Sequence, residues 1–111
     1  MPITHGNLFT ALPLPGASEA FEPLLEQQRV RIERIVSDAQ AIPPDFWYDQ
    51  AHTEWVALLQ GEAVIGFDDG HMHPLQPGDW LTIPAHCRHR VVSTAPRTVW
   101  LAVHLAPECA A

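Results

Sequence analysis

The sequence predicts an all-β fold, a small antiparallel sandwich or barrel preceded by one short helix. Many short segments carry strand-forming residues, and turns rich in glycine, proline and aspartate separate them. No helical pattern follows Val30, which excludes alternating strands and helices around a parallel sheet. With 111 residues the chain is expected to be one domain, divided into an N-terminal arm and helix (1–29) and a barrel (30–106).

The N-terminal part is predicted to be an extended arm followed by the helix. Prolines exclude a helix from residues 1–16, and one short strand is expected at 8–11. Helix-forming residues follow over 18–28. Because Pro23 fits only the first turn of a helix, we expect regular helix from near Glu22 onward. One face of this helix carries Phe21, Leu24, Leu25 and Gln28.

The barrel part begins with Val30–Ser37, where apolar and charged residues alternate as they do in a strand. Ile35 breaks the alternation, which indicates a bulge there. Asp69-Gly70 and Pro77-Gly78 are strong turn signals between later strands. The remaining strands are expected at 46–49, 54–60, 63–67, 72–75, 80–83, 90–93 and 98–105.

The composition argues against several classes of partner and location. The formal net charge is −7, from thirteen acidic residues against six arginines and no lysine. Nucleic acids and anionic membrane surfaces require a basic face, so neither is expected as a partner. The chain lacks a signal-peptide pattern and any apolar run of the ~20 residues that a membrane span needs. Cys109 lies near the C-terminus, so we expect no disulfide between it and Cys87. We therefore expect a protein of the reducing cytoplasm.

Two spaced motifs carry a family resemblance. Glu54 is followed by six residues and then Gly61, while Gly78 is followed by five residues, Pro84 and, five positions later, His89. This pattern resembles the two motifs of the cupin superfamily, and in particular its small single-domain members. The resemblance implies a β-barrel of the jelly-roll type.

The resemblance also implies a site for a divalent metal such as iron, manganese, nickel or zinc. In metal-binding cupins, two histidines, the glutamate and the second-motif histidine converge inside the barrel. Glu54 and His89 match, but the positions of the two histidines hold Tyr48 and Gln50, or Trp47 and Asp49 in the alternative spacing. The candidates for a metal site are therefore Glu54, His89, Gln50 and His52, and the candidates for the surrounding pocket are Tyr48, His86 and His104.

Two functions fit these residues. The first is a metal-assisted oxygenase, isomerase or lyase that acts on a small polar metabolite. The alternative is a non-catalytic barrel without metal that binds a small molecule or has a structural role. For Glu54 the alternative is a buried carboxylate paired with a cation or kept protonated, and for His89 a hydrogen bond to Glu54 without metal. His71 and His73 are expected on an exposed hairpin.

A homodimer is the expected assembly. Barrels of this size often bury an apolar outer sheet face against a second copy. The residues expected in that interface are Trp55, Ala57 and Leu59.

Overall fold

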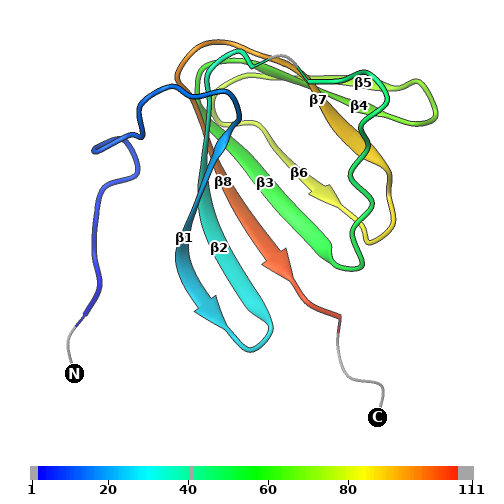
Figure 1. Cartoon of the computed structure of the whole chain (residues 1–111). Coiled ribbons are helices and arrows are strands. Elements are labelled where there is room, and N and C mark those ends of the chain that lie inside the picture. Colours follow the sequence, from blue (N-terminus) through cyan, green and yellow to red (C-terminus); the bar gives the residue numbers. More distant parts are fainter. Residues whose placement is uncertain (1–2, 41, 108–111) are drawn as a thin grey trace.

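The fold consists of two antiparallel β-sheets that face each other (Figure 1). A computed structural model describes residues 3–40 and 42–107 of the chain. The larger sheet has the strand order β1-β2-β8-β3-β6, and the smaller sheet has the order β5-β4-β7. The strands are β1 (Ala20–Gln27), β2 (Val30–Ser37), β3 (Thr53–Gln60), β4 (Ala63–Phe67), β5 (Met72–Leu75), β6 (Trp80–Ile83), β7 (His89–Thr94) and β8 (Thr98–Leu105).

The predicted all-β antiparallel class is confirmed, but the sheets do not close into a barrel. The chain crosses from one sheet to the other at four connections: β3 to β4, β5 to β6, β6 to β7, and β7 to β8. Strands joined by these connections therefore face each other instead of pairing. Within the described residues the strands form two separate sheets, with the site between them.

The predicted N-terminal helix is wrong, because residues 20–27 form strand β1 instead (Figure 1). A two-residue turn at Gln28 and Arg29 joins β1 to β2, and the pairing runs from Gln27 opposite Val30 to Ala20 opposite Val36. The helix-forming residues of this segment are overridden by the free edge of β2, which offers a complete set of ladder hydrogen bonds.

In this hairpin the register shift follows directly after a proline. Pro23 has no N–H group, and it lies on edge strand β1, the usual place for proline in a sheet. The β1–β2 register shifts between Pro23 and Leu25. The bulge predicted at Ile35 is therefore wrong, since Ile35 pairs regularly with Trp100 on β8.

Two smaller strand predictions also need correction. Residues 8–11 form a turn, in which the N–H of Thr10 donates to the carbonyl of Asn7. In the segment 46–49, only Tyr48 forms a β-bridge, opposite His89. The N–H of Phe46 instead donates to the carbonyl of Pro43 at 3.1 Å, and this hydrogen bond closes a turn that begins at the proline pair.

Arg34 fixes the N-terminal arm to the outer face of the larger sheet. Its guanidinium donates to the carbonyls of Leu8, Thr10 and Ala11 at 2.7–3.3 Å. The same group pairs with Glu22 on the neighbouring strand at 2.8 Å. The side chain is buried although it lies on a sheet surface, because the arm covers it.

The core fills the space between the two sheets. On β8, the side chains of Trp100, Ala102 and His104 are buried in this space. The apolar cluster consists of Ile35, Val56, Leu58, Ala63, Ile65, Leu75, Ile83, Trp100 and Ala102. Buried polar side chains on the same inner faces, among them Glu33, Glu54 and His89, form the candidate site.

The structure bears on the cysteines and on the question of a membrane-spanning helix. Within the described residues Cys87 forms no disulfide, and Cys109 lies outside them. Within residues 3–40 and 42–107, the structure has no helix with the length and hydropathy needed to span a membrane.

Candidate functional site

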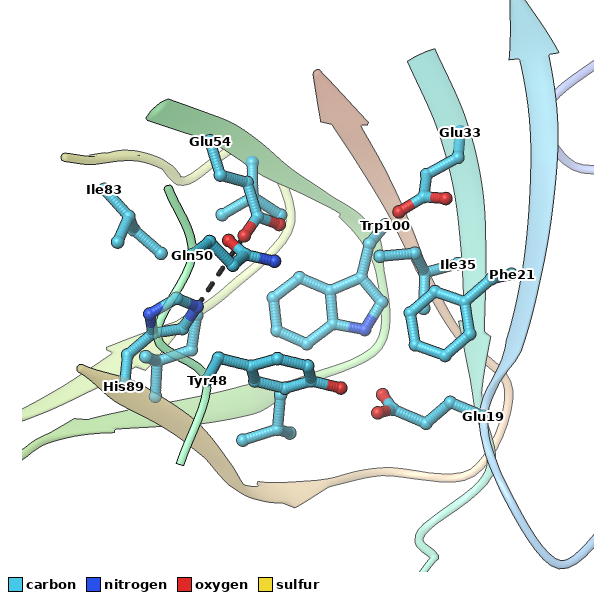
Figure 2. A pocket seen from close by; sticks show the side chains of 13 residues that line it. Glu19, Phe21, Glu33, Ile35, Tyr48, Gln50, Glu54, Ile83, His89 and Trp100 are labelled. Carbon is cyan, nitrogen blue, oxygen red and sulfur yellow. Dashed lines mark ion pairs between the residues drawn. The ribbon is translucent and has the colours of Figure 1, made fainter. Parts of the chain in front are cut away.

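A pocket opens between the two sheets, and Figure 2 shows the side chains that line it. The space that the centre of a water molecule can occupy in it measures about 60 Å³, enough for a few waters or a small ligand. The polar lining residues are Glu19, Glu33, Tyr48, Gln50, Glu54 and His89. The apolar lining residues are Phe21, Ile35, Val56, Ile65, Ile83, Val91 and Trp100.

An ion pair between Glu54 and His89 lies at one end of the pocket (Figure 2). Glu54 projects inward from β3 and His89 from the first position of β7, so the pair joins the two sheets. His89 Nε2 lies 3.6 Å from Glu54 Oε1, and both side chains are buried. His89 Nδ1 lies 2.8 Å from the carbonyl oxygen of Cys87. Because a carbonyl only accepts, Nδ1 carries a proton and Nε2 is directed at the carboxylate.

The surroundings of His89 favour its charged form. Burial by itself lowers the pKa of His89, because desolvation penalises the imidazolium. The interaction with the Glu54 carboxylate, the hydrogen bond to the Cys87 carbonyl and the negative charge of Glu54 together outweigh burial. The pKa of His89 is therefore raised above its ordinary value of 6.5, which favours an imidazolium beside the Glu54 carboxylate.

A second carboxylate enters the pocket from the segment before β1. Trp100 Nε1 donates to the Ser37 hydroxyl at 3.0 Å, and that hydroxyl in turn donates to Glu19. Burial raises the pKa of Glu19, and the hydrogen bond from Ser37 partly opposes the rise. Figure 2 shows the Glu19 carboxylate directed toward the Tyr48 hydroxyl. Burial, and then the charges of Glu19, Glu54 and Glu33, raise the pKa of Tyr48 and keep it a neutral phenol.

A third carboxylate, Glu33, is connected to two histidines. Glu33 Oε1 lies 2.7 Å from His104 Nε2, and His104 Nδ1 lies 2.8 Å from His52 Nε2. Glu33 and His104 are both buried, whereas His52 is half-buried. The three side chains form an unbroken hydrogen-bonded row that begins in the pocket.

The predicted metal ligands are only partly brought together. Glu54, His89 and Gln50 line the same pocket, and Figure 2 shows Gln50 beside Glu54. His52 does not line this pocket, because its ring is hydrogen-bonded to His104 and faces a separate hollow.

The predicted pocket residues divide in the same way. Tyr48 lines the pocket as expected. His104 does not line it, because its two ring nitrogens are engaged by Glu33 and His52. His86 is a surface residue with 70% of its side chain exposed. Its left-handed backbone, with φ of 61°, turns the ring outward to Asp49 at 2.9 Å.

The donor set at this pocket does not fit the expected metal centre. One imidazole and one carboxylate meet, and the neighbouring donor is the neutral amide of Gln50. Glu19 and Glu33 lie at the other end of the pocket, separated from the pair by the Trp100 ring (Figure 2). In the described part of the chain, no three histidine, cysteine, aspartate or glutamate side chains are grouped to hold one ion. A stable site of this class needs at least three such ligands.

Several residues that line the pocket were not predicted from the sequence, among them Glu19, Phe21, Glu33 and Trp100. Glu19 and Phe21 belong to the segment that was expected to be helical, so their direction could not be assigned. Trp100 was not singled out, because the sequence does not show which face of its strand is inside. Glu33 shares a strand face with Ile35, but which face of that strand is inside could not be predicted from the sequence.

Comparison with known proteins agrees with this architecture. Residues 38–104 match the family model described as Cupin domain. A candidate mannose-6-phosphate isomerase from Ralstonia eutropha JMP134 is 48% identical, with a TM-score of 0.89; the match covers 95% of this chain and 100% of that one. A cupin superfamily protein from Desulfitobacterium hafniense is 27% identical, with a TM-score of 0.70 and coverage of 95% and 100%.

A third solved structure supports the fold alone. An RmlC-like cupin protein from Desulfovibrio desulfuricans has a TM-score of 0.78 at 18% identity, and the match covers 96% of this chain and 100% of that one. Comparison with curated proteins gives no match.

Proposed function

This chain belongs to the cupin domain family, and from that premise we propose that its pocket binds a small organic cation such as an amine. The ammonium group would lie against the faces of Trp100 and Tyr48, with carboxylates at both ends of the pocket. The observation that carries the proposal is the convergence of Glu19, Glu33 and Glu54 on one small cavity.

The charge of the lining favours a cation. Three carboxylates line the pocket, and among the described residues His89 is the one lining side chain that can carry a positive charge. No arginine of the described segments lines it, and the chain has no lysine. Even with His89 protonated, the pocket has an excess of acidic groups in a region partly shielded from water, where charge interactions are stronger than in bulk solvent.

The walls of the pocket favour an organic cation over a metal ion. Aromatic faces attract ammonium groups through the negative charge of their π-systems. Phe21, Tyr48 and Trp100 all line the pocket. The carboxylates are spread along the cavity, so one point ion cannot contact them all, whereas a molecule with a short body can span them.

The relative's substrate class does not transfer readily to this pocket. The Ralstonia eutropha protein is described as a candidate isomerase of a phosphosugar. A phosphate ester carries nearly two negative charges and is usually held by arginine, lysine or helix N-termini. The lining of this pocket offers carboxylates in their place, and these would repel the phosphate.

The Glu54–His89 pair gives the pocket a means of proton transfer. When His89 is protonated it can donate through Nε2, and when it is neutral the same nitrogen can accept. If the bound amine reacts, these two residues would move its proton, as an isomerase or lyase step requires. Gln50 and Tyr48 would orient the ligand by hydrogen bonds.

The test is a binding titration followed by NMR. We expect ethanolamine, choline or tetramethylammonium to shift the Trp100 indole N–H signal of the ¹⁵N-labelled protein at millimolar concentrations. Glu54→Gln and Glu19→Gln should each weaken binding by roughly tenfold, since each removes one charge from the cavity. Glu62→Gln, which neutralises an exposed carboxylate outside the pocket, is the matched control and should bind as the wild type does.

Two results would overturn the proposal. One is the failure of all three cations to shift pocket signals in a protein that thermal melting shows to be folded. The other is tighter binding of mannose 6-phosphate, or of zinc, manganese, nickel or iron at one ion per chain, with loss of that binding in Glu54→Gln.

A further inference from the structure

The row formed by Glu33, His104 and His52 connects two separate cavities. Its inner end, Glu33, lines the pocket described above. Its outer end lies in a second hollow, lined by His52 and His104 together with the β1–β2 turn and the residues that follow β8. The row therefore runs from the interior to a solvent-facing hollow.

The geometry of the row fixes the direction of its hydrogen bonds. A carboxylate only accepts, so His104 must carry its proton on Nε2, where it donates to Glu33 at 2.7 Å. Nδ1 of a neutral His104 is then an acceptor, and His52 must donate to it from Nε2 at 2.8 Å. Nδ1 of His52 is left with its lone pair at the outer end.

We propose that Glu33, His104 and His52 form a proton relay between the pocket and solvent. A proton from water adds to Nδ1 of His52, and the Nε2 proton of His52 passes to Nδ1 of His104. The Nε2 proton of His104 then passes to Glu33, which becomes a neutral carboxylic acid in the pocket. Each ring ends neutral, with its proton moved to the other nitrogen, and the reverse sequence exports a proton.

The charged groups around the relay suit this role. Arg31 on β2 lies 3.8 Å from Glu33 Oε2 with about half of its side chain exposed. Glu54 is the cross-strand neighbour of His104 on β3. Burial, and then the repulsion that a protonated His104 would add, lower the pKa of His52, while Glu54 raises it, Arg31 lowers it and Glu33 raises it. The net lowering favours the neutral ring, whose Nδ1 lone pair the relay requires.

The relay differs from a hydrogen-bonded cluster that only stabilises the fold. A structural cluster needs each bond to be made, and a glutamine in place of His52 would make the same bond to His104. A relay also needs the outer residue to release one proton while it takes another. Histidine can do this at neutral pH, whereas a carboxamide cannot.

The test measures exchange of the His104 ring proton with water by NMR, in protein without ligand. It is thus independent of the proposed amine binding. We expect ¹⁵N spectra to show His104 and His52 both protonated on Nε2. In His52→Gln and in His52→Leu, exchange of the His104 Nε2 proton should slow at least tenfold while its ¹⁵N shift still reports the bond to Glu33. His5→Leu, an exposed arm histidine, is the matched control and should exchange as the wild type does.

The relay is overturned if His104 carries its proton on Nδ1. It is also overturned if exchange in His52→Gln is as fast as in the wild type while the bond to Glu33 is retained. If one variant fails to fold, the other decides the question, because the two replace His52 by side chains of different polarity.

Discussion

At the scale of single residues, burying a carboxylate and an imidazole together costs less than burying either alone. An unpaired charge between the sheets would lose its hydration without compensation. Glu54 and His89 avoid that loss by facing each other at 3.6 Å, and the Cys87 carbonyl holds the ring in place. The same arrangement that stabilises the pair places a proton donor in the pocket.

The raised pKa of His89 predicts how stability changes with pH. A group whose pKa is higher in the folded state stabilises the fold fully below its unfolded value of 6.5. The contribution is lost as pH rises through the folded value. We therefore expect His89→Gln to lower the free energy of unfolding by about 2 kcal/mol near pH 6, and by less near pH 8.5. Urea denaturation of both proteins across this range measures the difference.

His71→Gln provides the control, because His71 is an exposed histidine outside the pair. Its free energy of unfolding should follow that of the wild type at each pH. A difference between wild type and His89→Gln that grows with rising pH would contradict the prediction, since it would mean that folding lowers the pKa of His89.

Part of the site could be predicted from the sequence, namely the two residues that the spacing of the family motifs identifies. The motif spacing selected Glu54 and His89, and the structure places both in one pocket. Whether these residues bind a metal stays a prediction that metal analysis would test. Glu33 was missed because its contribution depends on which face of β2 is inside, and that is decided by packing between distant segments. Glu19 was missed because it precedes a strand that was expected to be a helix.

At the scale of elements, strand β1 shows where local propensity fails. Residues 20–27 contain several good helix formers, yet they pair with β2 as an edge strand. The later strands were predicted closely because tight turns bound them, and those turns depend on neighbouring residues alone. An edge strand takes all of its ladder hydrogen bonds from a single partner. Its assignment therefore depends on whether that partner is free, which local sequence does not encode.

The β3–β4 connection gives a prediction for backbone strain. Gly61 has φ of 91°, and a Cβ atom there would lie 2.3 Å from the Thr98 hydroxyl and 2.8 Å from the Thr98 Cα. Gly61→Ala should therefore combine an unfavourable dihedral angle with a clash against backbone. We expect it to lower the free energy of unfolding by about 3 kcal/mol or more, measured by chemical denaturation.

Gly70→Ala separates the two causes. Gly70 has a nearly equal φ of 92°, but a Cβ atom there would meet nothing within 4 Å. Its substitution should cost only the dihedral strain, about 1 kcal/mol. Equal decreases in the free energy of unfolding at the two positions would show that the contact with Thr98 does not contribute to the effect.

At the scale of the whole molecule, the larger sheet has an apolar face on the side away from the pocket. Ile32, Val103 and Trp55 form one row across the strands, and Leu101 and Ala57 belong to the next. Trp80 on edge strand β6 continues that second row and stacks on Trp55 with a centroid distance of 6.0 Å. Trp80 remains 59% exposed and extends the apolar face to the edge of the sheet, and contiguous apolar surface of this kind marks interaction sites.

These rows lead us to expect that two copies associate through the outer face of the larger sheet, around Trp55 and Ala57. A stable interface of this kind buries roughly 800 Å² on each partner, with aromatic residues supplying most of the binding energy. Trp80→Glu should weaken the dimer by about a hundredfold. The monomer should stay folded, because the side chain is exposed within one chain.

Met72→Glu, an exposed position on the smaller sheet, is the control and should leave association unchanged. Sedimentation equilibrium at micromolar concentration measures all three proteins, and a monomeric wild type, or a Trp80→Glu protein that dimerises as tightly, would show that this face is not the interface.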